Sequence, residues 1–257
     1  MKDLVIVGAG QSAAQCILTL KRNNFEDSIV VIGEEDHLPY QRPPLSKDYL
    51  TSEVGLERVY MKTQDFYDQN NVIVKTSTKV LSLDRTEKKL HLSNGETLEY
   101  LNLVLATGSR VRLLEVQGSN LKNINYLRTI NDSNSLKEQF KKGGKLVIIG
   151  AGYIGLEVAA AAVKKGLEVT VVEMADRVMN RTVDPVISKY FDTLHRKNGV
   201  EIILGTALER FEGETTVKKV VCTDGTKLDA DAVIIGVGII PNQELAQAAG
   251  LKCENGI

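Results

Sequence analysis

The sequence predicts an α/β protein built from two similar domains, each a parallel sheet with a small antiparallel meander. Two repeated patterns predict it. A short apolar run, a glycine-rich turn and a helical pattern follow one another at residues 4–21 and again at residues 146–165. An Asn-Gly or Asp-Gly hairpin turn followed by a fully apolar run occurs at residues 92–108 and again at residues 222–238. Each half therefore predicts a strand, a helix, a strand, a meander and a final strand.

The spacing of these repeats indicates domain duplication. Gly8 and Gly150 are 142 residues apart, and Gly95 and Gly225 are 130 residues apart, far beyond the roughly 20–50 residues of solenoid repeats. The first half is therefore 12 residues longer between its glycine turn and its hairpin. We assign the extra length to residues 34–59, an irregular stretch with three of the five prolines. Long ordered loops are often functional.

Composition excludes several classes of protein. The 257 residues are 43% hydrophobic, enough for one large or two modest cores. A formal net charge of −1, with no run of five like charges, argues against nucleic acid as a partner. No apolar stretch approaches the roughly 18 residues of a membrane-spanning helix. Asp3 and Gly8 interrupt the first apolar run before a signal-peptide core could form, so we expect a cytoplasmic protein.

Cysteine and histidine usage predicts no metal site. The three cysteines, Cys16, Cys222 and Cys253, are far apart and form no Cys-x-x-Cys pair. This argues against a disulfide framework, a zinc site and a redox-active dithiol. The three histidines are scattered and suggest neither a metal cluster nor a catalytic base. Any redox chemistry would therefore come from a cofactor.

Both glycine-rich turns match the fingerprint of a Rossmann-like dinucleotide-binding domain. A strand running into Gly-x-Gly-x-x-Gly/Ala and then a helix lets backbone approach a pyrophosphate, and the helix N-terminus supplies partial positive charge. The expected contacts in the first copy are Gly8, Gly10, Ser12 and Ala13, with Ala13 in place of the third glycine. Those in the second copy are Gly150, Gly152, Tyr153, Ile154 and Gly155.

An acidic residue follows the second strand of each copy, Glu34 after residues 29–32 and Glu173 after residues 169–172. A carboxylate there accepts hydrogen bonds from ribose hydroxyls, although both acids could instead be solvated residues at strand ends. Glu173 would repel a 2′-phosphate and the nearest cation, Arg177, lies further along, which favours NADH over NADPH. Two dinucleotide sites in one chain suggest a bound FAD and an exchangeable NADH.

Residues 38–50, LPYQRPPLSKDYL, carry a more specific signal. The prolines fix the backbone, Ser46 can cap a short helix, and Arg42 and Lys47 supply cations, although a rigid surface loop would look the same. The segment resembles the Arg-Pro-Pro-Leu-Ser-Lys signature of the FAD- and NADH-dependent ferredoxin reductases of oxygenase systems. That family includes rubredoxin and putidaredoxin reductases and is similar to apoptosis-inducing factor. The resemblance implies a glutathione-reductase-like fold and a small iron–sulfur acceptor, ferredoxin or rubredoxin.

The resemblance also implies roles for individual residues. Arg42 and Pro43 would lie by the flavin pyrophosphate, and Lys47 by the flavin ring. Glu157 would lie near the nicotinamide carboxamide and could pair with Lys47, although it could also be an ordinary helix-surface carboxylate. Lys47 and Glu157 are our candidate catalytic residues. The other expected cofactor contacts are Val80, Ala106, Thr107, Gly108, Arg177, Arg181, Gly236, Val237 and Gly238.

Domain limits follow from the same resemblance. It implies an FAD-binding domain over residues 1–110 and 241–257 and an NAD-binding domain over residues 111–240. Members of the family continue with a second FAD segment containing a Gly-Asp pair, and then with a C-terminal interface domain. No such pair follows Gly238, so we expect the closing FAD segment and the interface domain to be absent from these 257 residues.

The predicted activity is hydride transfer from NADH to FAD, followed by delivery of single electrons to a small iron–sulfur protein. Three alternatives stay open. Flavin disulfide reductases and NADH peroxidases share the architecture but need a reactive cysteine where residues 42–47 stand. An NADH-responsive binding module like apoptosis-inducing factor would use the reduced flavin to control association. A nucleotide-binding fragment would bind without turnover.

Overall fold

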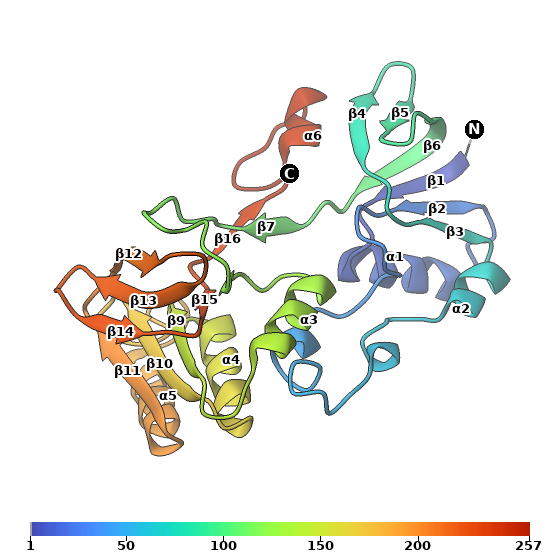
Figure 1. Cartoon of the computed structure of the whole chain (residues 1–257). Helices are drawn as coiled ribbons and strands as arrows, with labels where there is room; N and C mark the ends of the chain where they lie inside the picture. The colour runs from blue at the N-terminus through green and yellow to red at the C-terminus, as the bar shows by residue number, and fades with distance from the viewer. Residues whose placement is uncertain (1) are drawn as a thin grey trace. The chain divides into compact units, whose positions relative to one another are not determined.

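The computed structural model describes residues 2–257, which form two compact units (Figure 1). Unit 1 contains the residues up to Arg42 together with Gly55–Arg110 and Ile240–Ile257, and unit 2 contains Pro43–Val54 and Val111–Ile239. These limits differ from the sequence-based ones in two places: residues 43–54 pack with the second unit rather than the first, and Ile240 belongs to the first unit. The assignment of the units to FAD and NAD stays a prediction.

Unit 1 is a six-stranded sheet in the order β3-β2-β1-β6-β5-β4. The pairs β1–β2, β1–β6 and β2–β3 are parallel, and β4–β5–β6 form an antiparallel meander. Its elements are β1 (Lys2–Val7), α1 (Gln11–Arg22), β2 (Ile29–Ile32), α2 (Gln64–Gln69), β3 (Val72–Lys75), β4 (Val80–Asp84), β5 (Lys89–Leu92), β6 (Thr97–Leu105) and α6 (Glu244–Ala248).

Unit 2 repeats this order with a five-stranded parallel sheet, β11-β10-β9-β15-β8, and a separate three-stranded meander, β12-β13-β14. Its elements are β8 (Ile124–Asn125), α3 (Ile130–Gln139), β9 (Lys145–Ile149), α4 (Tyr153–Lys164), β10 (Glu168–Glu173), α5 (Pro185–Lys197), β11 (Val200–Leu204), β12 (Leu208–Gly213), β13 (Val217–Cys222), β14 (Lys227–Asp229) and β15 (Ala232–Ile235). Strands β7 (Ser109–Val111) and β16 (Ile239–Pro241) lie where the chain passes between the units.

The two copies differ in how the meander joins the parallel sheet. In unit 1 the nine-residue β6 pairs with β5 through residues 97–99 and with β1 through the rest. In unit 2 the strand is interrupted between β14 and β15, at Asp231. The Asp231 N–H donates to the Lys145 carbonyl oxygen, and the Asp231 carboxylate accepts from the Lys145 N–H. The predicted fold class is confirmed in both units. The hairpin pattern predicts a final strand separate from the meander, as in unit 2, whereas in unit 1 the continuous strand β6 serves as both.

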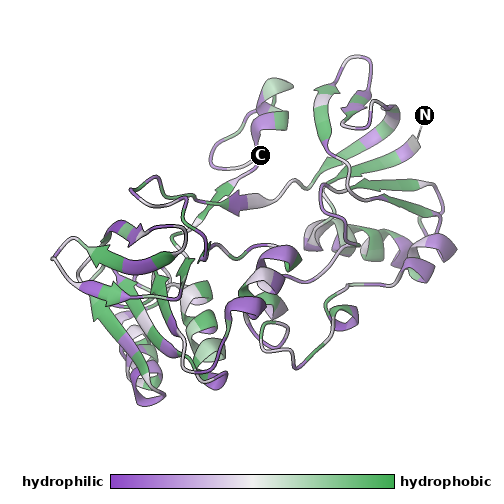
Figure 2. Cartoon of the chain, viewed as in Figure 1, coloured by the Kyte–Doolittle hydropathy of each residue, from purple (hydrophilic) through white to green (hydrophobic). Residues whose placement is uncertain are grey.

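Alternation along the central strands explains why they are apolar throughout. Leu4 and Ile6 of β1 belong to the cluster with α1 and α2, whereas Val5 and Val7 belong to the cluster with the meander. Because successive side chains point to opposite faces, a strand covered on both faces is a continuous apolar run. Figure 2 shows these strands as hydrophobic in both units.

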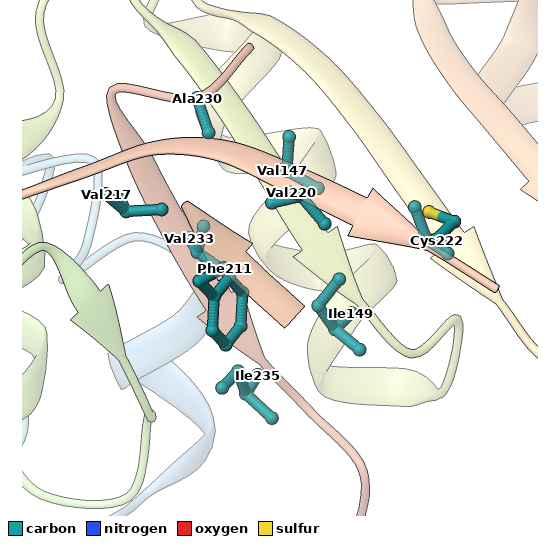
Figure 3. Close-up of a cluster of buried hydrophobic side chains, with 10 residues drawn as sticks. Val147, Ile149, Phe211, Val217, Val220, Cys222, Ala230, Val233 and Ile235 are labelled. Atoms are coloured by element: carbon teal, nitrogen blue, oxygen red, sulfur yellow. The ribbon is translucent and has the colours of Figure 1, made fainter. Parts of the chain in front are cut away.

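The core of unit 2 lies between its parallel sheet and its meander (Figure 3). Phe211 of β12 is 2% exposed and belongs to one cluster with Val147 and Ile149 of β9. Between those two residues, Ile148 faces α4 instead: a Cβ placed on Gly155 would lie 3.3 Å from its Cγ2 atom. The meander and α4 therefore cover opposite faces, and the glycine turn follows at the carboxyl end of β9.

The third position of the glycine fingerprint sets how closely each helix approaches its strand. Ala13 of α1 is buried with a Cβ, whereas a Cβ on Gly155 of α4 would lie 2.1 Å from the carbonyl oxygen of Gly150. Helix propensity alone favours alanine over glycine by about 1 kcal/mol. The backbone contact opposes this preference and leaves no space for the extra carbon.

We expect Gly155→Ala to lower the free energy of unfolding by about 1–3 kcal/mol, because backbone must move to relieve the clash. Urea unfolding measures it. Gly152→Ala is the matched control, since a Cβ there meets nothing within 4 Å. Equal stability of the Gly155→Ala variant and the parent chain would contradict the packing argument.

Candidate functional site

The first glycine of each turn lies where two central strands end. Gly8 follows β1, between β2 and β6, and Gly150 follows β9, between β10 and β15. Their φ angles are +108° and +102°, a region that favours glycine. A Cβ on them would lie 2.1 Å from the oxygen of Ala106 and 2.6 Å from that of Gly236. The structure thus brings two predicted residues of the last strands against the predicted first glycines.

The second glycine of each turn has a different explanation. Gly10 and Gly152 are the N-caps of α1 and α4, with φ angles of −91° and −81° that any residue adopts. A Cβ on either would meet nothing within 4 Å. The chain's own packing therefore does not require glycine here. A pyrophosphate approaching the backbone does require it, so both turns fit a dinucleotide.

Strand register shows that the two predicted acids are not equivalent. Val7 pairs with Ile32, whose next residue is Gly33, whereas Ile149 pairs with Val172, whose next residue is Glu173. A Cβ on Gly33 would lie 2.6 Å from the Cβ of Ala9, so unit 1 has no space for a side chain at that position. Glu34 therefore stands one residue further along than Glu173, a difference that the apolar runs alone did not indicate.

Glu173 is held by backbone. Its carboxylate accepts hydrogen bonds from the N–H groups of Ala151 at 2.7 Å and Ala175 at 2.9 Å. A carboxylate has about four lone-pair sites, so two remain for a ribose. The contact with Ala151 also ties the glycine turn to the end of β10.

The predicted cation Arg177 is occupied by the loop that follows β10. Its guanidinium donates to the carbonyl oxygens of Val183 and Asn180, each at 2.9 Å. These bonds close the turn before α5. Arg181 lies exposed in the same loop. A nucleotide contact for either arginine stays a prediction, and the observed bonds of Arg177 are structural.

Glu34 lies beside the other residues predicted for an adenosine site. Its Oε1 atom pairs with Lys79 Nζ at 3.0 Å, and Val80 follows at the start of β4. Both charged side chains are more than half exposed. The structure therefore brings Glu34 and Val80 into one area of unit 1 and adds Lys79 between them.

Sequence reasoning missed the residues that hold Arg42. The Arg42 guanidinium donates to Glu35 Oε1 at 2.8 Å and to Tyr40 Oη at 2.9 Å, and Tyr40 Oη donates to Glu35 Oε2 at 2.6 Å. The Arg42 N–H lies 3.4 Å from Gln11 Oε1, which places this cluster by the first turn of α1. The second acid of the Glu-Glu pair was the available signal. Ser12, in the same turn of α1, is exposed.

Asn242 holds residues 106–108 in place through hydrogen bonds. Thr107 Oγ1 donates to the Asn242 carbonyl oxygen at 2.5 Å, and Asn242 Nδ2 donates to the Thr107 oxygen at 2.9 Å. The Asn242 N–H also donates to the oxygen of Gly108. The corresponding residues of unit 2, Val237 and Gly238, follow Gly236 at the end of β15. Asn242 is a further functional residue that was not predicted from the sequence.

Residues 43–54 are attached to unit 2 through side chains. Ser133 of α3, fully buried, donates to the Leu45 oxygen at 2.9 Å, and Tyr49 Oη donates to Asn134 Oδ1 at 2.8 Å. The ammonium group of Lys137 lies over the Tyr49 ring, an arrangement that stabilises a cation. These contacts explain why the segment packs with α3.

Charged groups secure the far end of this segment. Glu53 pairs with Lys164 of α4 at 2.5 Å. The hydrogen bond from Lys164 lowers the pKa of the Glu53 carboxyl, and the same bond raises the pKa of the Lys164 ammonium. Burial lowers the pKa of Lys137, since a low-dielectric environment disfavours its charged form.

The predicted pairing of Lys47 with Glu157 is confirmed, with Nζ and Oε1 2.6 Å apart. Ser46 was expected to cap a helix, and this expectation is wrong. Ser46 ends the 3₁₀ turn Pro43–Ser46 and donates its hydroxyl to Glu157 Oε2 at 2.5 Å. Tyr153 and Ile154, four and three residues before Glu157, lie on its side of α4 and are 53% and 38% exposed. The Glu157 carboxylate, fixed beside the exposed apolar side chains of Tyr153 and Ile154, could bind a flat ring that carries an amide, as a nicotinamide does.

Known proteins place the chain in a family. The family model described as pyridine nucleotide-disulphide oxidoreductase matches residues 2–257. The chain belongs to this family. No helix in residues 2–257 has the length and apolar character to cross a membrane.

Relatives within the family confirm the resemblance seen in residues 38–50. The chain is 41% identical over 256 residues to rhodocoxin reductase of Rhodococcus erythropolis, covering 99% of this chain and 60% of that protein. It is 38% identical over 255 residues to a rubredoxin-NAD(+) reductase of Pseudomonas putida, covering 99% and 66%. The chain therefore spans roughly three fifths of the length of the curated relatives it matches.

Solved structures agree in fold. The covalent putidaredoxin reductase–putidaredoxin complex matches with a TM-score of 0.96 and 41% identity, over 100% of this chain and 63% of that chain. A ferredoxin reductase for the CYP199A2 system of Rhodopseudomonas palustris matches with the same TM-score and identity, over 100% and 64%. The predicted two-domain fold class is thereby confirmed.

The second glycine of each turn, Gly10 and Gly152, allows a test of cofactor binding without a change in packing, because a Cβ on either meets nothing within 4 Å. We expect Gly10→Ala to weaken FAD binding by about tenfold or more, because the added carbon lies where the pyrophosphate approaches. Gly152→Ala should weaken NADH binding by a similar factor. Calorimetric titration measures both affinities. Each variant is the control for the other, so a loss of both ligands in either one would contradict the assignment.

Proposed function

We propose that this protein is a flavoprotein oxidoreductase that oxidises NADH and reduces a small iron–sulfur protein. The observation that carries the proposal is the Lys47–Glu157 pair beside the second glycine turn. Names of the relatives support it: rhodocoxin reductase, putidaredoxin reductase and rubredoxin-NAD(+) reductase. A ferredoxin or rubredoxin is the acceptor that this resemblance favours.

Unit 1 is the proposed FAD site and unit 2 the proposed NADH site. In unit 1, Gly10 leaves room for a pyrophosphate and Arg42 lies by the first turn of α1. In unit 2, Gly152 leaves room in the same way, and Glu173 keeps lone pairs for a ribose. FAD, when bound, supplies a two-electron acceptor for hydride that can release electrons one at a time.

The residues of the chain have binding and orienting work to do. Hydride transfer needs the nicotinamide held in one geometry, and no side chain need act as a nucleophile. Glu157 can accept a hydrogen bond from the carboxamide. Lys47 balances its charge and brings a cation to the edge of the site. Tyr153 and Ile154 offer apolar surface at the helix start.

Preference for NADH follows from the charges at the end of β10. Glu173 is fixed there by two backbone N–H groups, and the guanidinium of Arg177 is engaged by loop carbonyls. A 2′-phosphate would therefore meet a negative charge. We also propose that the protein works in the cytoplasm, since all three cysteines are free, as is usual in reducing compartments.

We expect Glu173→Gln to raise the affinity for NADPH relative to NADH by about tenfold, because it removes one negative charge and keeps an acceptor oxygen. Parallel titrations with the two nucleotides measure the ratio. Glu168→Gln, at the other end of the same strand, is the matched control. An unchanged ratio in Glu173→Gln would remove Glu173 from the basis of the preference.

The direct test of the proposal is a titration of the chain with FAD, followed by addition of NADH and then of an oxidised iron–sulfur protein. The proposal predicts stoichiometric flavin binding, bleaching of the flavin by NADH and rapid recovery with reduction of the acceptor. A reduced flavin that persists in a slow complex with the nucleotide would instead support a binding module. Bound flavin that NADH does not bleach would overturn the proposal.

We expect Glu157→Ala to slow flavin reduction by NADH by about tenfold or more, because the nicotinamide loses an orienting partner. Rapid-mixing absorbance measures the rate constant. Glu53→Ala is the matched control, since it removes another carboxylate paired with a lysine in unit 2, away from the glycine turn. A parental rate in Glu157→Ala would remove that residue from the mechanism.

A further inference from the structure

We propose that Ser46 is a positioning residue that sets the orientation of the Glu157 carboxylate toward the nicotinamide. The inference rests on the proposed function and names a part of the site beyond the Lys47–Glu157 pair. Ser46 is 5% exposed, at the end of the 3₁₀ turn Pro43–Ser46. A buried hydroxyl normally has a hydrogen-bond partner, and here the partner is the carboxylate of a helix more than a hundred residues away.

The carboxylate of Glu157 is held at both oxygens. Ser46 Oγ lies 2.5 Å from Oε2, and Lys47 Nζ lies 2.6 Å from Oε1. Two contacts on different oxygens fix the plane of the group as well as its place. Two lone-pair sites remain, and their direction is set by the two contacts.

The single proton of Ser46 has two acceptors within reach. The Pro43 carbonyl oxygen lies at 3.3 Å and Glu157 Oε2 at 2.5 Å. A hydrogen bond to an ionised acceptor is shorter and stronger than one between neutral groups. The hydroxyl therefore donates to the carboxylate.

Ser46 determines orientation better than Lys47 does. The Lys47 side chain is 44% exposed on a flexible stem, and its three donors can follow the carboxylate through many geometries. The hydroxyl of Ser46 has one rotatable bond to a backbone that Pro43 and Pro44 restrict. The preceding residue, Leu45, is bound through its carbonyl oxygen to buried Ser133. Lys47 thus supplies the charge and Ser46 the direction.

A first experiment needs no cofactor. Urea unfolding of Ser46→Ala, Glu157→Ala and the double variant gives the coupling between the two side chains. We expect a coupling equivalent to about tenfold in the unfolding equilibrium constant, as for a hydrogen bond to a charged group. Ser133→Ala is the matched control: it removes a buried serine hydroxyl that anchors the same turn without touching Glu157, and its effect should add to that of Glu157→Ala. Additive effects of Ser46→Ala and Glu157→Ala would overturn the inference.

A second experiment uses the FAD-loaded chain and rapid mixing with NADH. We expect Ser46→Ala to lower the limiting rate of flavin reduction by about tenfold while the NADH dissociation constant changes by less than about twofold. Threonine and valine are isosteric with each other, and only threonine has a hydroxyl. A role for the hydroxyl therefore predicts a near-parental rate of flavin reduction in Ser46→Thr and a low rate in Ser46→Val. In the Glu157→Ala background, Ser46→Ala should have no further effect on the rate.

The outcomes separate this inference from the proposed function. If NADH does not reduce the flavin bound to the parent chain, both the proposed function and the role of Ser46 are overturned. If NADH reduces the flavin of the parent chain and of Ser46→Ala at the same limiting rate, the role of Ser46 is overturned and the proposed function stands. A loss of rate that persists in the Glu157→Ala background, or that Ser133→Ala reproduces, assigns Ser46 to the stability of the turn and overturns the inference as well.

Discussion

The close approach of backbone to backbone at the two glycine turns is the constraint on which the rest of the structure depends. A Cβ on Gly8 or Gly150 would lie within 2.6 Å of a carbonyl oxygen at the end of the neighbouring strand. Only glycine lets the strand before each turn end side by side with its neighbour, β1 with β6 and β9 with β15. That contact places a helix N-terminus at the carboxyl end of each sheet, where a pyrophosphate would meet backbone N–H groups and a favourable dipole.

One architecture serves two different sites because the residues after the second strand differ. Glu173 occupies its register position and ties the glycine turn to β10. Unit 1 has Gly33 packed against Ala9 there, and its acids follow one and two residues later. Glu35 then holds Arg42, whereas Arg177 in the corresponding loop of unit 2 is held by main-chain carbonyl oxygens. Electrostatics thus separates the copies: a carboxylate fixed by backbone in one, a guanidinium held by a carboxylate in the other.

The sequence was sufficient for the fold and the duplicated fingerprints, because periodicity and glycine spacing are local properties. The Lys47–Glu157 pair was predicted only through the family resemblance. The sequence was insufficient for register, which shows that Glu34 and Glu173 are not equivalent. It was also insufficient for the packing of residues 43–54, which depends on Ser133 and Asn134 of a distant helix. The same limit applies to Ser46: its sequence neighbours suggest a cap, and only the tertiary structure brings it to the carboxylate. Contacts between distant segments leave little trace in a single sequence.

The central claim is that the second glycine of each turn, Gly10 or Gly152, marks a pyrophosphate site. The most direct measurement is a crystal structure of the chain with FAD and NAD⁺. The account predicts one pyrophosphate over Gly10 at the first turn of α1 and another over Gly152 at the first turn of α4, with the nicotinamide by Glu157. A nucleotide pyrophosphate bound away from either turn would contradict it.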